Sequence, residues 1–392
     1  MNRTERVRRQ KHVDISHVIT SIFASIGRFV KKNPVLTIAA ACALVTSVIV
    51  PPDAAYLGYF DFRTLTCLFC TLAVICALGE IKFFYVCAQR IISLAKNLRL
   101  ATLALVYITF IGSMLIANDM ALITFLPLGY IVLHCTDNKR HMAYVFILQN
   151  IAANLGGMLT PFGNPQNLYL YSYFGIGEGE FMLAMLPPFA VAVALITLCC
   201  FVMPKTPLTF SGESEKMPKA KLTVYLALFA LSIAVVFRGI PYALGLVVIT
   251  VALFFLDREA LKRVDYGLLL TFVCFFIFSG NMSRIGSVSA LMESLLGGSA
   301  ERTLFFSAMS CQAISNVPSA ILLSKFAESW KPLLYGVNIG GCGTLISSLA
   351  SLITFRTFNK HNPGHAKRYI VMFSVLNFAF LGVLLLFCLA IV

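Results

Sequence analysis

Long apolar segments separated by short polar loops run along the chain after residue 33. Segments of this length and polarity are typical of helices that cross a membrane. Two amphipathic stretches with basic residues, 15–30 and 82–99, predict instead helices on the cytoplasmic membrane surface. The pattern therefore predicts an all-α, polytopic membrane protein. Full crossings are predicted at 34–50, 63–78, 181–202, 222–237, 242–256, 266–278 and 369–392.

Two pairs of shorter apolar arms predict re-entrant hairpins. In the first, 101–116 and 121–133 flank the polar tip Ala117-Asn118-Asp119. Each arm is shorter than the roughly 20 residues that a full crossing needs, and basic residues stand at both outer ends. In the second, 303–314 leads to the tip Ser315-Asn316-Val317-Pro318.

Each predicted hairpin is followed by an apolar segment that glycine, proline and amide residues interrupt. The first, 142–174, contains Asn154-Leu-Gly-Gly157-Met-Leu-Thr160-Pro-Phe-Gly163-Asn164-Pro-Gln-Asn167, and the second, 333–355, contains Asn338-Ile-Gly-Gly341-Cys-Gly-Thr344-Leu-Ile-Ser347-Ser348. Lipid offers no hydrogen bonds to an opened backbone, so such breaks occur where protein or a water-filled cavity supplies the partners. Broken helices place helix N-termini and free carbonyls near the bilayer midplane, where they hold ions and polar substrates.

The two halves of the chain share an order of elements and a short sequence pattern. The breaks agree at their first asparagine, both adjoining glycines and the threonine without a gap, and Asn118 and Asn316 occupy the two tips. Glycine-rich membrane helices also look alike because small residues serve helix packing. Here, however, several elements recur in one order, which favours an internal repeat of the kind found in many secondary transporters.

The repeat divides the chain into four predicted parts. Residues 1–33 form a basic tail and surface helix, 34–203 the first repeat, 204–221 a cytoplasmic linker and 222–392 the second repeat, in which 283–296 lies on the outer surface. Threading from a cytoplasmic N-terminus to an outer C-terminus satisfies the positive-inside rule. It opens the two hairpins from opposite sides, so the repeat is inverted, as alternating access requires. Of the 31 Lys and Arg, it leaves outside only Arg63, Arg238, Arg284, Arg302, Lys325 and Lys331.

Composition supports the membrane assignment and restricts the chemistry. Hydrophobic residues make up 59% of the chain and charged residues 12%, with a mean hydropathy of +0.85, which is far from the soluble average. The net charge of +14 does not indicate a nucleic-acid partner, because the basic residues are scattered over short loops. Cysteine and histidine spacings indicate neither a zinc site nor a disulfide framework, and no P-loop is present. No cofactor is expected beyond a coupling ion.

Asp119 is the only carboxylate at a predicted hairpin tip. An ionisable group at membrane depth indicates function, here the binding of a cation or the exchange of a proton, although it would also serve as a helix cap. The tip asparagines offer amide oxygens to a cation or amide N–H groups to an oxyanion, or simply close the tips. The candidate Na⁺ ligands are Asn118, Asp119, Asn154, Asn316 and Asn338. The candidate substrate and ion contacts are these five with Gly157, Thr160, Gly163, Asn164, Asn167, Ser315, Gly341, Thr344, Ser347 and Ser348.

The function class follows from these features. A channel also uses re-entrant hairpins, but a pore forms more naturally from several subunits around an axis. An intramembrane enzyme needs a paired Asp, a Ser–His arrangement or HExxH, whereas Asp119 stands alone and the histidines lie in or beside polar loops. The sequence favours a secondary active transporter. Neither predicted site contains Lys or Arg, so an anion would rely on helix N-termini, amides and co-bound cations, and a small neutral substrate fits equally.

The tip Ala117-Asn118-Asp119, the break from Asn154 to Asn167 and their echoes in the second half resemble the ion transporter superfamily. This group includes arsenite-efflux permeases, citrate permeases, sodium/proton antiporters and divalent-anion/sodium symporters. The Asn-Asp tip is most similar to the arsenite- and citrate-permease branch, because the dicarboxylate symporters have Ser-Asn-Thr there. The resemblance implies a homodimer with a scaffold domain and an elevator-type transport domain.

The sequence and the resemblance together predict what the protein does. We expect a membrane-embedded transporter of a small anion or oxyanion, coupled to Na⁺ or H⁺, in the cytoplasmic membrane of a prokaryote. An arsenite or antimonite efflux permease and a Na⁺/H⁺ antiporter of the same fold are the alternatives. The substrate, the coupling ion and the direction of transport stay open at this point.

Overall fold

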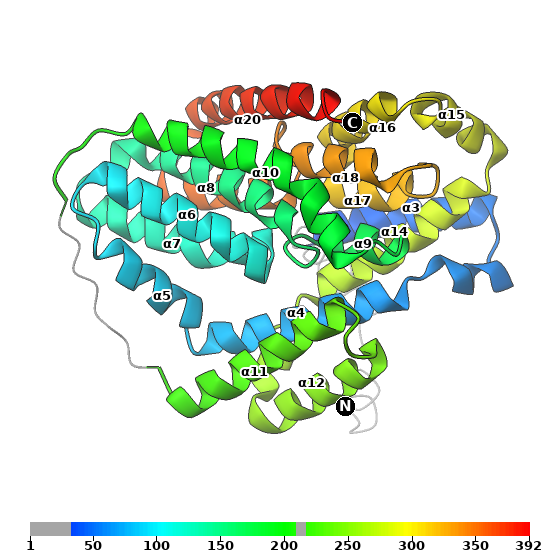
Figure 1. Ribbon diagram of the computed structural model, residues 1–392, viewed down its shortest axis with the longest axis horizontal. Helices are drawn as coiled ribbons and strands as arrows, with labels where there is room; N and C mark the ends of the chain where they lie inside the picture. The colour runs from blue at the N-terminus through cyan, green and yellow to red at the C-terminus, as the bar shows by residue number, and fades with distance from the viewer. Residues whose placement is uncertain (1–32, 209–216) are drawn as a thin grey trace, which may run out of the picture.

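The computed structural model describes residues 33–208 and 217–392, and every regular element within these ranges is a helix (Figure 1). The predicted surface helix at 15–30 and residues 209–216 of the predicted linker lie outside the described residues. Eight of the described helices are long and apolar enough to cross a membrane, which makes the chain a multi-pass membrane protein. They are Phe62–Glu80, Leu98–Ile116, Asn118–Cys135, Lys139–Leu159, Glu178–Phe201, Lys219–Val236, Tyr266–Ser283 and Ala366–Leu389.

The first half begins with a helix that a short 3-10 turn connects to the next. Two long antiparallel helices follow, and then two shorter helices that an irregular segment separates. In chain order the helices are α3 (Pro34–Ile49), α4 (Phe62–Glu80), α5 (Phe83–Ile92), α6 (Leu98–Ile116), α7 (Asn118–Cys135), α8 (Met142–Gly156), α9 (Pro165–Tyr173) and α10 (Glu178–Phe201).

The second half contains a similar series, with α11 and the short α13 in addition. Its helices are α11 (Lys219–Val236), α12 (Tyr242–Leu256), α13 (Arg258–Lys262), α14 (Tyr266–Ser283), α15 (Gly286–Leu296), α16 (Ala300–Ile314), α17 (Asn316–Leu323), α18 (Trp330–Ile339), α19 (Leu349–His361) and α20 (Ala366–Leu389).

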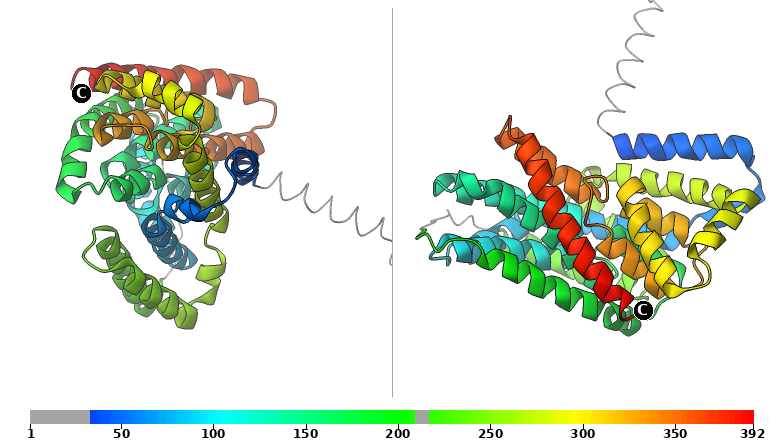
Figure 2. Two further views of the ribbon diagram at one scale, coloured as in Figure 1. Left: turned by 90° about the vertical axis from the view of Figure 1, so that its right-hand side faces the viewer. Right: turned by 90° about the horizontal axis from the view of Figure 1, so that it is seen from above.

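The helices pack in two groups. α4, α11 and α12 lie together in Figure 1, apart from α6, α7, α8 and α10, and α5 leads from one group to the other. α3 lies along α14, while α20 crosses obliquely over the second group (Figure 2). α8 is almost entirely enclosed, whereas most residues of α10, α11 and α20 are partly or fully exposed. These exposed faces are suited to lipid, because a helix satisfies its own backbone there.

The halves interlock through crossed contacts. α3 packs against α14, and α12 packs against α4, so the first helix of each series contacts the second helix of the other. Likewise α19 packs against α7, and α9 packs against α17. Each irregular break therefore lies beside the hairpin of the opposite half.

The arms of the first hairpin are longer than predicted. α6 and α7 contain 19 and 18 residues, so the length argument for a re-entrant loop is wrong for this hairpin. α6 begins at Leu98 because the side chain of Asn97 accepts a hydrogen bond from the Leu100 N–H at 3.0 Å and caps the helix. Of the predicted surface helix at 82–99, α5 covers only Phe83–Ile92, and the last two residues belong to α6.

Candidate functional site

The two hairpin tips adopt the same backbone turn. Ala117 has φ 64° and ψ 152°, and Ser315 has φ 75° and ψ 158°. A residue other than glycine in this region costs about 1–3 kcal/mol and persists only where its surroundings hold it. In both tips the next side chain braces the turn, because Oδ1 of Asn118 accepts the Asp119 N–H at 3.0 Å and Oδ1 of Asn316 accepts the Val317 N–H at 2.9 Å.

The two breaks are attached to their hairpins by matching hydrogen bonds. Thr160 donates its hydroxyl to the carbonyl of Met114 at 2.8 Å, and Thr344 donates to the carbonyl of Gln312 at 3.0 Å. Each acceptor lies in the last turn of the first hairpin arm. The shared threonine of the sequence pattern therefore ties each break to its own tip.

A chain of buried amides connects the first tip with both breaks. Asn118 donates to Oδ1 of Asn154 at 3.2 Å, and Asn154 donates to the carbonyl of Gly341 at 3.4 Å. Asn164 donates to Oδ1 of Asn338 at 3.4 Å, and Asn338 donates to Oδ1 of Asn167 at 2.7 Å. All five asparagines are at most 4% exposed. A buried network of this kind fixes one geometry, because each unsatisfied member would be costly.

The second tip joins the same centre through its backbone. The Asn316 N–H donates to the carbonyl of Ser347 at 2.9 Å, and the Ser347 hydroxyl donates to the carbonyl of Gly341 at 2.8 Å. A Cβ atom on Gly341 would lie 3.3 Å from the Asn316 amide nitrogen and 3.8 Å from the Asn154 Cβ. Residues of both halves thus meet around Gly341.

Two glycines of the first break are required by close backbone approach. A Cβ on Gly157 would lie 2.4 Å from Oδ1 of Asn164, and one on Gly163 would lie 2.4 Å from the carbonyl of Gly157. Only glycine allows this contact. The loop is closed further by Asn167, which donates to the carbonyl of Gly157 at 3.0 Å.

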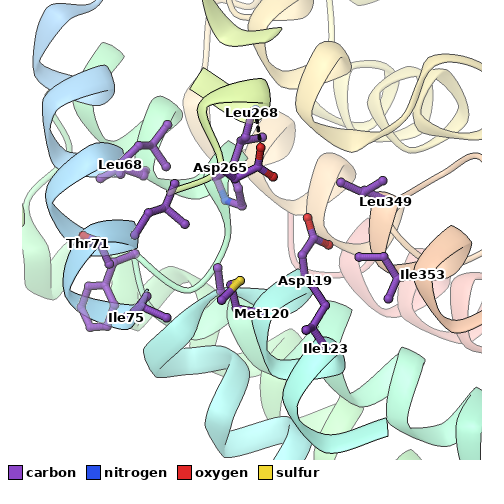
Figure 3. Close-up of a pocket in the computed structure, with 15 residues that line it drawn as sticks. Leu68, Thr71, Ile75, Asp119, Met120, Ile123, Asp265, Leu268, Leu349 and Ile353 are labelled. Carbon is purple, nitrogen blue, oxygen red and sulfur yellow. Dashed lines mark hydrogen bonds between the residues drawn. The ribbon is translucent and has the colours of Figure 1, made fainter. Parts of the chain in front are cut away.

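Asp119 stands in the first turn of α7 and lines a cavity of about 80 Å³ (Figure 3). Its Oδ1 atom is buried and has no hydrogen-bond partner in the described part of the chain. No Lys or Arg in the ranges 33–208 and 217–392 lines this cavity. A carboxylate oxygen in such a place is suited to receive a proton or a cation.

The sequence profile of a family described as "Citrate transporter" matches residues 21–332, which is most of the chain. The chain belongs to this citrate transporter family. An uncharacterized transporter of Methanocaldococcus jannaschii is 32% identical over 81% of this chain and 86% of its own length. An inner membrane protein of Escherichia coli is 28% identical over 71% of this chain and 74% of its own length. A low-affinity phosphate transporter of Saccharomyces cerevisiae is 32% identical over 29% of this chain and 13% of its own length.

These relationships confirm the resemblance to the ion transporter superfamily. The names of the family and of two of these three relatives are those of transporters, not enzymes. The protein is therefore a multi-pass membrane transporter.

In this citrate-transporter-family chain, most of the sequence-predicted site residues lie in one connected region. Ser348 differs, because its side chain serves as a helix cap. Its hydroxyl accepts the Ser351 N–H at 3.2 Å at the start of α19. Asn164 stands at the equivalent N-cap position of α9, but without a capping hydrogen bond, so its amide remains in the network.

Sequence reasoning missed three glutamines. Gln312 donates to the carbonyls of Gly340 and Cys342 at 2.9 and 3.0 Å and accepts the Thr344 N–H at 2.9 Å, so it organises the second break. Gln149 is fully buried and donates to Thr109 and the carbonyl of Phe125. Gln166 is 1% exposed, and neither of its amide atoms has a partner among the described residues. Their signal was an amide inside an apolar segment.

Proposed function

We propose that this protein is a secondary active transporter that moves a small anion or oxyanion, coupled to Na⁺ or H⁺, by elevator-type alternating access. The observation that carries the proposal is the meeting of two matching hairpin tips and two breaks around Gly341. An alternating-access site must be reached from either side, and a site built from related halves meets that requirement.

The crossed packing supports an inverted repeat. Each half supplies the same series of elements, and each break contacts the hairpin of the other half. We assign the scaffold body to α3, α4, α11, α12 and α14, and the transport body to α6–α9 and α16–α19. The cavity at Asp119 is lined from both bodies, as expected of a site that moves past a scaffold.

The substrate class follows from what surrounds the breaks. Helices α9 and α19 begin where the two breaks end, so their N-termini lie at the breaks. Helix N-termini attract anions. The amide network supplies uncharged donors and acceptors. Since no basic side chain is present in either predicted site, a co-bound cation would balance the charge of an anion.

Asp119 favours a second candidate of the same fold, a Na⁺/H⁺ antiporter. Its unpartnered Oδ1 atom serves a transported cation as well as a coupling cation. Arsenite or antimonite efflux stays an alternative, since a small neutral substrate needs no charged contact.

The surrounding assembly is part of the proposal. We place the chain as a homodimer in the cytoplasmic membrane of a prokaryote, with the N-terminus in the cytoplasm and the C-terminus outside, because this orientation places most Lys and Arg on the inner side. No cofactor other than the coupling ion is involved.

The test is thermal unfolding of the purified protein with citrate, succinate, phosphate, sulfate and arsenite, each with and without Na⁺ and at two pH values. A ligand that binds the folded state raises its stability. An anion whose stabilisation requires Na⁺ or low pH supports coupled anion transport. Stabilisation by Na⁺ or protons alone favours the antiporter. No shift with any of these ligands or ions would count against the proposal.

The binding residues are tested by Asn118→Ala and Asn316→Ala, which should both weaken the ligand-induced shift. Asn377→Ala is the matched control, since Asn377 is fully buried in α20 and its amide donates to the carbonyl of Phe373 in the same helix. An effect in only one tip variant would mean that only one half forms the site.

A further inference from the structure

A second carboxylate, that of Asp265, lines the cavity at Asp119. Asp119 lines it from the start of α7 and Asp265 lines it from the start of α14 (Figure 3). Oδ1 of Asp119 is buried, whereas Asp265 is an exposed residue. The cavity is therefore lined by a partly buried carboxylate with one oxygen shielded from water and by an exposed carboxylate that water reaches.

The rest of the lining is almost entirely apolar, with Leu68, Met120, Leu268 and Leu349 among the contributing residues. Thr71 adds one hydroxyl, which is buried and has no partner among the described residues. Among the residues that the structure describes, Asp119 and Asp265 are the only titratable ones that line the cavity. Two carboxylates facing one apolar space repel each other, and a cation held between them removes this repulsion.

Helix capping uses only one of the two oxygens of the Asp265 carboxylate. Oδ1 of Asp265 accepts the Leu268 N–H at 2.9 Å and caps α14. Asp61 caps α4 in the same way, with its Oδ1 accepting the Thr64 N–H at 2.9 Å, but Asp61 does not line the cavity. The cap leaves Oδ2 of Asp265 free for another ligand.

The basic residue nearest to Asp265 in the chain is already engaged. Arg263 forms an ion pair with Glu80 at the end of α4. Arg263 therefore neutralises the Glu80 carboxylate, and the negative charge of Asp265 can be neutralised by a mobile cation.

We propose that Asp265 and Asp119 together form an entry site for the coupling cation, in which Asp265 captures a monovalent cation from water and Asp119 holds it at the hairpin tip. This inference rests on the proposed function, since the cation is the one that drives transport. Because Asp265 belongs to the scaffold body and Asp119 to the transport body, the site exists only while the tip lies beside α14. Movement of the transport body separates the pair and commits the cation to Asp119.

The cation of the proposed coupling is Na⁺ or a proton. A proton needs a single oxygen, and Na⁺ would complete its shell with the water that the cavity admits. The chemistry common to both is a single positive charge, and the experiment separates them.

The test measures cation-dependent stability of the purified full-length protein, which does not depend on the identity of the anion. Thermal unfolding is followed against NaCl at constant ionic strength, with choline chloride as the replacement, and against pH in choline chloride. Asp265→Asn removes the charge and keeps a good capping residue. Asp61→Asn makes the same change at the cap outside the cavity and serves as the matched control.

If the ion is Na⁺, Asp265→Asn should raise the Na⁺ concentration at half-maximal stabilisation by about tenfold, equivalent to about 1.4 kcal/mol. If the ion is a proton, the variant should lose the stabilisation that the wild type gains as the pH falls. Asp61→Asn should behave as the wild type in both arms.

A wild-type cation response in Asp265→Asn overturns the inference, as does a wild type that responds to neither ion. A failure of the proposed function gives a different result. In that case the cation would still stabilise the wild type more than Asp265→Asn, but a gradient of that cation would not drive anion uptake into proteoliposomes.

Discussion

Asn338 of the second break donates a hydrogen bond of 2.7 Å to Oδ1 of Asn167, which lies in the first turn of α9. Both side chains are at most 1% exposed. This bond joins the two halves of the chain directly at the candidate site. Both partners are buried amides, so removal of one leaves a polar atom of the other buried without a hydrogen bond, which destabilises the fold.

Removal of either amide should therefore destabilise the protein. Asn338→Ala and Asn167→Ala should each lower the free energy of unfolding by about 1–3 kcal/mol, because each leaves a buried partner unsatisfied. The double variant should cost less than the sum of the single variants, since contacting residues are coupled. Chemical unfolding in detergent measures all three. Additive losses would show that the bond does not connect the breaks.

The glycines of the first break provide a second prediction. Gly157→Ala and Gly163→Ala should each lower the melting temperature strongly. The added methyl group would lie only 2.4 Å from another atom of the same loop, which is too close without a rearrangement. Gly179→Ala is the matched control: its methyl group would meet nothing within 4 Å, and Gly179 is the second residue of α10.

The control should be neutral or stabilising, since alanine is favoured over glycine in a helix by about 0.5–1 kcal/mol. Equal behaviour of the three variants would contradict the close approach seen at the break.

An ion pair outside the membrane-spanning segments predicts a pH dependence. Arg284 donates to both carboxylate oxygens of Asp53, at 3.0 and 2.7 Å, and this lowers the pKa of Asp53 below its model-compound value of 3.8. A carboxyl whose pKa is lower in the folded state contributes stability above its unfolded pKa and loses it as the pH falls through the folded value. The pair connects the loop after α3 with the end of α14.

Asp53→Asn should thus melt below the wild type at pH 6, and the difference should shrink as the pH falls below about 3.8. Glu259→Gln is the control, because Glu259 and Lys262 form an exposed pair within α13 and surface pairs of this kind contribute little. A difference that stays constant with pH would rule out the Asp53 charge as its cause.

Helix ends at the first break follow local signals in the sequence. α8 ends at Gly156, just before Gly157, and α9 starts at Pro165, because proline suits the first turn of a helix. The helix start at Leu98 was missed because the Asn97 cap gives only a weak signal among apolar residues.

Long-range relationships could not be predicted from the sequence. Asp265 caps α14, and only the tertiary arrangement of the helices places it in the lining of the same cavity as Asp119. Gln312 likewise acquires its role only when the second break folds back over α16. Such contacts depend on how distant helices pack, which no local pattern encodes.

The most direct test of coupled transport is gradient-driven uptake in proteoliposomes by wild type and Asp119→Asn, using the anion that stabilises the protein most. The wild type should accumulate the anion when a Na⁺ or proton gradient is imposed. Asp119→Asn should fold but fail to accumulate the anion against its gradient, because the site for the coupling cation has lost its charge. Wild-type accumulation in Asp119→Asn would contradict the role of Asp119 in coupling.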